Sequence, residues 1–271
     1  MHTPIVIDRR TFIADLGRGA FALAVVSVAG CSPAASASPA GSASASASAG
    51  STGASSSPSG GEETAAPSAP PSVGGAAFAW ERVNLGFVSA YILSRDGEAA
   101  IVDTGVGGSA DAIEASLTGI GLDWSAVGHL ILTHRHGDHV GSAPDVLERA
   151  PDAMGYAGAA DAVSITVPRP LTAVEDGDDV FGLTIITTPG HTPGSISVFD
   201  QVGGVLVAGD ALGTGGGLPM LPGVQFTEDM DRAKESVVKL GGLTFETLLV
   251  GHGDPIEGGA AALVAELGAA G

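Results

Sequence analysis

The chain has few positive charges and a single cysteine. Its 271 residues include 11 lysines and arginines against 30 aspartates and glutamates, which gives a formal charge of -19 at pH 7. Nucleic acids and anionic lipids are bound through clustered lysine and arginine, so this balance argues against a nucleic-acid partner and against electrostatic docking on a membrane. The lone cysteine, Cys31, excludes an internal disulfide, so the fold must depend on a packed core or on metal.

The first thirty residues are typical of an export signal. Arg9 and Arg10 precede a short apolar run at 21–29, whereas a membrane span needs about 20 apolar residues. The paired arginines resemble a twin-arginine signal, with an ordinary secretory signal as the alternative. Residues 28–31, Val-Ala-Gly-Cys, resemble a bacterial lipobox, with a free thiol as the alternative. We therefore expect an exported protein that is lipid-anchored through Cys31 on the extracytoplasmic face of the cell membrane.

A change in composition divides the remaining chain. Residues 31–76 are almost only Ser, Ala, Gly and Pro, which cannot bury enough apolar surface to offset the entropy lost on ordering. This segment is predicted to be a disordered tether. Residues 77–271 carry the apolar periodicity of a folded sequence and are long enough for one domain with its own core.

Short apolar runs rich in β-branched residues predict strands within this domain. The strands are expected at 79–83, 90–94, 99–102, 130–132, 183–187, 205–208 and 247–250. Helical spacing predicts one helix at 109–118 and another at 227–239. The second helix has Thr227 as its candidate N-cap and Met230, Ala233 and Val237 on one face.

Side chains that can bind metal follow four of the predicted strands, just past the point where each strand ends. A single Gly-His or Gly-Asp after a strand is usually only a turn, but the repetition is hard to explain in that way. Loops at one edge of a sheet converge on a shared site, so we expect these side chains to lie together. They are His134, His136, Asp138, His139, His191, Asp210 and His252. His129 stands at the start of a strand and is expected to be structural.

The set of motifs resembles the metallo-β-lactamase superfamily of hydrolases. The matching segments are 102–105 (Val-Asp-Thr-Gly), 133–139 (Thr-His-Arg-His-Gly-Asp-His), 189–195 (Pro-Gly-His-Thr-Pro-Gly-Ser), 209–210 and 251–253. The resemblance implies an α+β fold, a four-layer αββα sandwich. It also implies that Asp103 supports the first loop rather than binding metal.

The resemblance further implies a binuclear metal centre. In it, His134, His136 and His191 hold the first ion, and Asp138, His139 and His252 hold the second, with Asp210 bridging both. Imidazole and carboxylate ligands suit Zn²⁺, so two Zn²⁺ ions per chain are expected, with iron or manganese as alternatives.

The implied activity is hydrolysis by a metal-bridging hydroxide that attacks a carbonyl. Asp210 would orient this nucleophile and Asp138 would help to move its proton. An ester, lactone or thioester is the expected substrate. Hydroxyacylglutathione hydrolases of the superfamily share the full ligand set, although their substrate is cytosolic, and lactonases share the bridging aspartate and would meet their substrates outside the cell. The acyl pocket is expected around 87–91, 154–156 and 213–226. The partner is a small-molecule substrate, membrane contact is through the lipid anchor only, and the sequence leaves the oligomeric state open.

Three alternatives stay open at this point. One is a β-lactamase, although β-lactamases with this first motif generally lack the bridging aspartate. Another is a mononuclear iron dioxygenase acting on persulfides, which uses part of the same ligand set. The third is a lipoprotein that binds metal or ligand without turnover.

Overall fold

The computed structural model describes residues 75–270. The predicted signal, the lipidation site Cys31 and the tether up to residue 74 lie outside the described residues, and the first strand begins at Ala79. No helix in the described part of the chain has the length and apolar character needed to cross a membrane.

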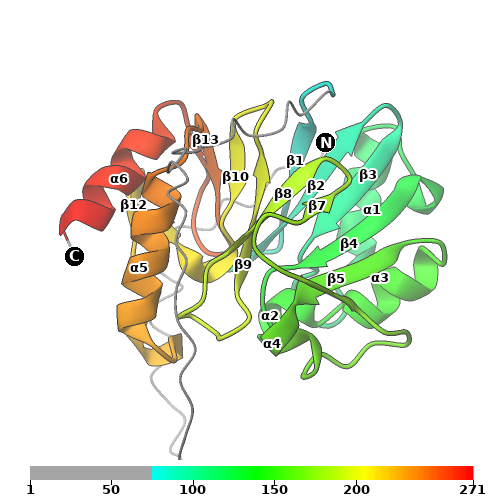
Figure 1. The fold of residues 1–271 in the computed structure, drawn as a ribbon. Coiled ribbons are helices and arrows are strands. Elements are labelled where there is room, and N and C mark those ends of the chain that lie inside the picture. The colour runs from blue at the N-terminus through cyan, green and yellow to red at the C-terminus, as the bar shows by residue number, and fades with distance from the viewer. Residues whose placement is uncertain (1–74, 271) are drawn as a thin grey trace, which may run out of the picture. The chain divides into compact units, whose positions relative to one another are not determined.

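Two six-stranded sheets form the centre of the domain (Figure 1). The first sheet has the order β1-β2-β3-β4-β5-β6, and the second has the order β14-β13-β10-β9-β8-β7. The strands of the first sheet are β1 (Ala79–Asn84), β2 (Ser89–Arg95), β3 (Glu98–Val102), β4 (Val127–Leu132), β5 (Met154–Gly158) and β6 (Thr172–Val174). Those of the second are β7 (Asp179–Val180), β8 (Leu183–Thr187), β9 (Ile196–Asp200), β10 (Val205–Val207), β13 (Thr247–Leu249) and β14 (Ile256–Glu257).

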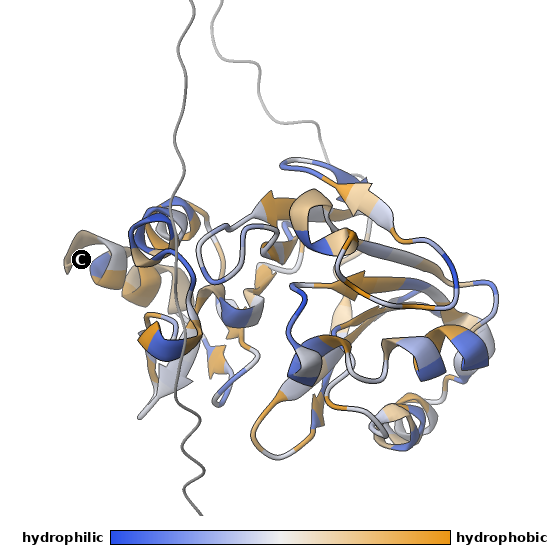
Figure 2. Ribbon diagram, turned by 90° about the horizontal axis from the view of Figure 1, so that it is seen from below, coloured by the Kyte–Doolittle hydropathy of each residue, from blue (hydrophilic) through white to orange (hydrophobic). Residues whose placement is uncertain are grey.

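Helices cover the outer face of each sheet. Figure 1 shows α1 and α3 on one side of the paired sheets and α5 and α6 on the other. The helices are α1 (Ala110–Gly119), α2 (Gly137–Val140), α3 (Ala143–Arg149), α4 (Ala159–Ala162), α5 (Met230–Gly241) and α6 (Ala260–Ala270). Short 3-10 turns are η1 (Trp124–Ala126), η2 (Gly209–Ala211) and η3 (Val224–Phe226), and a small hairpin is formed by β11 (Gly213–Gly215) and β12 (Leu218–Met220). Along the flanking helices, hydrophilic and hydrophobic stretches alternate (Figure 2).

The strands supply three layers of core because their side chains alternate between two faces. In β4, Leu130 and Leu132 pack with α1 and α3, whereas Ile131 packs between the two sheets. In β10, Val207 faces the first sheet and Leu206 packs with α5 and α6. Both sheets are therefore buried on both faces, and the predicted four-layer αββα sandwich is confirmed.

One detail of the predicted second helix is wrong. The helix begins at Met230, and its cap is Asp229, whose carboxylate accepts a hydrogen bond from the backbone N–H of Arg232 at 3.0 Å. Thr227 instead donates its hydroxyl to the carbonyl of Gly223, which fixes the turn before the helix. The predicted apolar face is present, since Ala233 and Val237 are buried.

Candidate metal centre

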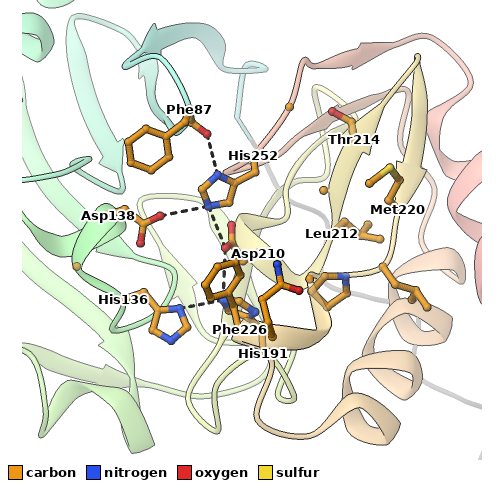
Figure 3. A pocket seen from close by; sticks show the side chains of 17 residues that line it. Phe87, His136, Asp138, His191, Asp210, Leu212, Thr214, Met220, Phe226 and His252 are labelled. Carbon is orange, nitrogen blue, oxygen red and sulfur yellow. Dashed lines mark hydrogen bonds and ion pairs between the residues drawn. The ribbon is translucent and has the colours of Figure 1, made fainter. Parts of the chain in front are cut away.

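The seven predicted ligands converge at one edge of the paired sheets. β8 and β10 are each antiparallel to β9, so they run in the same direction, and β13 is parallel to β10. The loops after these strands therefore leave their sheet at a common edge. The end of β4 meets them there, because the backbone N–H of Ile196 at the start of β9 donates to the carbonyl of Thr133 at 2.9 Å. The structure brings all seven predicted ligand side chains together there: His134, His136, Asp138, His139, His191, Asp210 and His252. Figure 3 shows those that also line the adjoining cavity, namely His136, Asp138, His191, Asp210 and His252.

Three histidines form the first group. Nδ1 of His136 lies 3.1 Å from Nε2 of His134 and 3.0 Å from Nε2 of His191. The ligand atoms of this group all lie within 4.8 Å of one another, which is the spacing of side chains able to share one metal ion. The residues are those expected for the first ion.

Asp138, His139 and His252 form the second group, again with ligand atoms within 4.8 Å of one another. Nε2 of His252 is 3.3 Å from a carboxylate oxygen of Asp138. Asp210 lies between the two groups, because its carboxylate oxygens are 3.3 Å from Nε2 of His191 and also 3.3 Å from Nε2 of both His139 and His252. This is the position expected of a bridging residue.

Hydrogen bonds at the far ring nitrogen turn two of these imidazoles toward the site. Nδ1 of His139 is 2.8 Å from Oδ2 of Asp103, and Nδ1 of His252 donates to the carbonyl of Phe87 at 2.7 Å. Such outer contacts fix ring orientation and leave Nε2 as the ligand atom. Asp103 also accepts hydrogen bonds from the backbone N–H and hydroxyl of Thr133, so it supports the first loop as expected.

Burial and charge set the protonation of the cluster. Burial lowers the pKa of His191 to about 4 and that of His134 well below its usual range, so both are neutral near pH 7. Burial also opposes the charge on His139, but the carboxylates of Asp103 and Asp210 outweigh it and raise its pKa to about 10. Burial disfavours ionised Asp210, yet His139 holds its pKa well below the usual range. These carboxylates therefore favour a proton on His139 in the metal-free chain, and a cation bound at Nε2 would take the place of that proton.

Two buried atoms indicate that the cluster fits metal ions. Nε2 of His139 and Oδ1 of Asp210 lie 3.3 Å apart without the alignment of a hydrogen bond. Within the described residues, only one other buried side-chain atom, the indole nitrogen of Trp124, lacks a partner. Buried polar atoms are normally paired, and a cation between them would satisfy both. Imidazole and carboxylate donors are the set that Zn²⁺ and related ions prefer.

Asp161 is a supporting residue that sequence reasoning missed. It is fully buried, and its carboxylate accepts hydrogen bonds from the backbone N–H and guanidinium of Arg135, the hydroxyl of Thr192 and the N–H of Gly194. Arg135 lies between His134 and His136, and Thr192 follows His191, so one carboxylate joins the two loops of the first group. An aspartate in an Ala-rich stretch carries no local signal of this role.

A cavity of about 690 Å³ opens beside the cluster. Asp138, Asp210 and His252 line it together with Phe87 and with residues 212–214, 220–223, 225 and 226. The expected contributions of Phe87 and of 213–226 are thus present. The expected contribution of 154–156 is wrong. Met154 begins β5 and pairs with His129 of the parallel strand β4, whereas the site lies beyond the other end of β4. Tyr91 is buried between the sheets and also lies outside the lining.

His129 is separate from the cluster, as expected. Its ring stacks on Phe181 with ring centres 4.9 Å apart, and Nδ1 is 3.3 Å from the hydroxyl of Tyr156. It belongs to none of the metal-capable groups. Its contacts are those of a structural histidine.

An αββα sandwich with histidine and aspartate clusters at one sheet edge defines the class of metallo-hydrolases. A family model described as the metallo-beta-lactamase superfamily matches residues 83–252, and the chain belongs to this superfamily. The fold, the metal-capable groups and the family model agree on this assignment.

Individual relatives share about a third of their residues or fewer with this chain over the aligned segments. The chain is 34% identical over 174 residues to the probable metallo-hydrolase YflN of Bacillus subtilis (strain 168), which covers 48% of this chain and 65% of that protein. It is 34% identical over 160 residues to a hydroxyacylglutathione hydrolase of Parasynechococcus marenigrum (strain WH8102), covering 55% of this chain and 60% of that protein. The chain thus spans less than two thirds of the length of either relative. A metallo-beta-lactamase family protein from Thermus thermophilus shares the fold with a TM-score of 0.57 at 24% identity, covering 72% of this chain and 79% of that chain.

Proposed function

We propose that the protein is a hydrolase that uses two divalent metal ions, zinc foremost, to cleave an ester, lactone or thioester. The observation that carries the proposal is the place of Asp210. Its carboxylate lies between His191 of the first group and His139 and His252 of the second, at 3.3 Å from each. A carboxylate in that place is suited to hold two cations side by side, which is the arrangement of two-metal hydrolytic sites.

When bound, such ions supply a Lewis acid for a carbonyl oxygen and a water of lowered pKa. The side chains of the chain have the remaining tasks. Asp210, with 10% of its side chain exposed, orients the attacking water because it faces both groups. Asp138 is more open, with 29% of its side chain exposed, and lines the cavity, so it is placed to take the proton and pass it to the leaving group.

The cavity lining supports a water nucleophile. Among the described residues that line it there is no serine or cysteine. The hydroxyl of Thr214 donates to the carbonyl of Asp254 at 2.6 Å, so it is engaged in fixing a loop. A covalent acyl-enzyme mechanism therefore has no evident nucleophile in this part of the chain.

The test is metal content and turnover of an Asp210→Ala variant on a panel of esters, lactones, thioesters and β-lactams. We expect weaker occupancy of one metal position and a rate lowered about 10²–10⁴-fold, because an orienting group is removed from the reacting centre. His129→Ala is the control, and it should keep both its metal and its rate. Two metals and wild-type turnover in Asp210→Ala, or one iron with oxygen uptake on a persulfide in the wild type, would contradict the proposal.

A further inference from the structure

Large apolar side chains gather at the mouth of the cavity with much of their surface exposed. Phe87, Met220 and Phe226 line the cavity, and Leu218 and Val224 stand beside them on the hairpin and on η3. The exposed fractions are 63% for Phe87, 50% for Met220, 64% for Phe226, 56% for Leu218 and 71% for Val224. Exposed apolar surface that is contiguous around a pocket marks a binding surface.

This apolar surface is attached to the metal centre. The backbone N–H of Thr214 donates to the carbonyl of His252 at 3.0 Å, which joins the β11–β12 hairpin to the loop of a predicted ligand. The turn of the hairpin uses Gly216 and Gly217 at positive φ, 60° and 79°, a conformation that glycine adopts without strain. Phe87 stacks on His252 with ring centres 6.1 Å apart. A chain that rests on this surface would therefore have its head group at the cluster (Figure 3).

Outside the proposed metal site, the described lining of the cavity has no positively charged side chain that a negatively charged substrate could contact. This described lining contains no lysine or arginine, while Asp138 and Asp210 contribute carboxylates. The arginines beside it are already paired. Arg82 binds Asp254 at 2.9 Å, and Arg135 binds Asp161 at 2.6 Å. Recognition of a carboxylate-bearing group such as glutathione needs a free cation or a comparable donor set, which this lining does not provide.

We propose that the substrate is an uncharged acyl compound with an apolar chain of several carbons, and that glutathione thioesters are poor substrates. This proposal rests on the hydrolase function proposed above. The acyl chain lies along Met220 and Phe226, and the carbonyl carbon lies at Asp210. In the reaction the acyl C–O or C–S bond breaks, the hydroxyl of one water joins the carbonyl carbon, and the remaining proton goes to the leaving alcohol or thiol.

The experiment compares matched substrates on the metal-loaded protein. One series is the acetyl, butanoyl and octanoyl thioesters of N-acetylcysteamine, which is uncharged, and the other is the same acyl groups on glutathione. We expect kcat/KM on the uncharged series to rise about fourfold for each methylene group that becomes buried, through KM. We also expect each N-acetylcysteamine thioester to be cleaved at least tenfold faster than its glutathione counterpart, about 1.4 kcal/mol.

Two variants locate the effect. Met220→Ser and Phe226→Ser should flatten the chain-length dependence and raise KM for the octanoyl substrate, with little change for the acetyl substrate. Val163→Ser is the matched control, because Val163 is 87% exposed at the C-terminal end of α4 and is not part of the lining. It should leave the dependence unchanged.

Outcomes separate the two proposals. Equal rates along the acyl series, or a preference for glutathione thioesters, would overturn the substrate assignment and leave the hydrolase function standing. Absence of turnover on every thioester, ester and lactone would overturn the function itself. In that case, melting-temperature shifts with acetohydroxamate and octanohydroxamate still test the apolar surface, and equal shifts would overturn it.

Discussion

Replacing Asp161 by asparagine tests whether one buried carboxylate holds the two loops of the first histidine group. Oδ1 of Asp161 accepts from the guanidinium of Arg135 at 2.6 Å and from the N–H of Gly194 at 3.0 Å. Oδ2 accepts from the N–H of Arg135 at 2.9 Å and from the hydroxyl of Thr192 at 2.6 Å. All four partners are donors, and an asparagine amide nitrogen in place of either oxygen would face two of them with another donor.

The magnitude follows from this mismatch. Each buried donor left without an acceptor costs about 1–3 kcal/mol, and removal of one partner of a buried ion pair costs about 3–5 kcal/mol. The side chain of Arg135 is 26% exposed and also binds Glu228, so water and Glu228 recover part of the loss. We expect Asp161→Asn to lower the free energy of unfolding by about 2–4 kcal/mol. We also expect metal affinity to fall about 10–100-fold, as it does when a supporting contact of a ligand loop is lost.

Urea unfolding and zinc competition with a chromogenic chelator measure the two effects. Asp176→Asn is the control, because Asp176 pairs with Lys239 in an ion pair whose side chains are 53% and 40% exposed, and such pairs contribute about 0–1 kcal/mol. Wild-type stability and wild-type zinc affinity in Asp161→Asn would refute the reasoning. Loss of stability with unchanged zinc affinity would show that Asp161 supports the fold alone.

Three other predictions concern different parts of the chain. Burial raises the pKa of Tyr91 to about 12, and its hydroxyl donates to the carbonyl of Val250 at 2.8 Å, so Tyr91→Phe should cost about 1 kcal/mol in urea unfolding at pH 7. The raised pKa stabilises the folded wild type fully below pH 10, the pKa of tyrosine in the unfolded chain, and this stabilisation is lost as the pH rises through about 12. The free energy of unfolding should therefore fall less in Tyr91→Phe than in the wild type between pH 10 and 12. Gly209 has φ of 54°, and a Cβ there would lie 2.7 Å from the side chain of Thr133, so Gly209→Ala should lower the melting temperature by several degrees, for about 1–3 kcal/mol of strain. We propose that Cys31 carries the lipid anchor; Cys31→Ser should then release the protein from the membrane fraction, and a fully soluble wild type would contradict this.

Local patterns were sufficient to predict much of the fold. The β-branched runs predicted as strands form β4, β8, β10 and β13. The bounds of β8 are as predicted, β10 and β13 end one residue earlier, and β4 begins three residues earlier. The metal-capable side chains come together because these strands run toward a common edge. The position of each such residue just past the end of a predicted strand was therefore enough to predict a shared site. The site could therefore be assembled without knowledge of the sheet order.

Other elements carry no such pattern. In β9, five consecutive residues are buried although they include Ser197 and Asp200. Ser197 donates its hydroxyl to the carbonyl of Ala208, and Asp200 accepts a hydrogen bond from the backbone N–H of Phe78, 122 positions away. The helix α6 is rich in alanine and apolar at every position but Glu266, so its spacing does not define a face. Such elements, like the role of Asp161, depend on contacts between distant segments, and only the folded chain reveals them.

Zinc titration of the metal-free domain tests the central claim most directly. Calorimetry with native mass spectrometry of the protein containing residues 75–271 should show two zinc ions bound per chain, and Asp210→Ala should bind one of them weakly. The loaded wild type should also melt at a higher temperature than the chelated form, because ions that bind only the folded state stabilise it. Binding of no zinc, or of a single ion whose affinity does not depend on Asp210, would contradict a binuclear site built around that carboxylate.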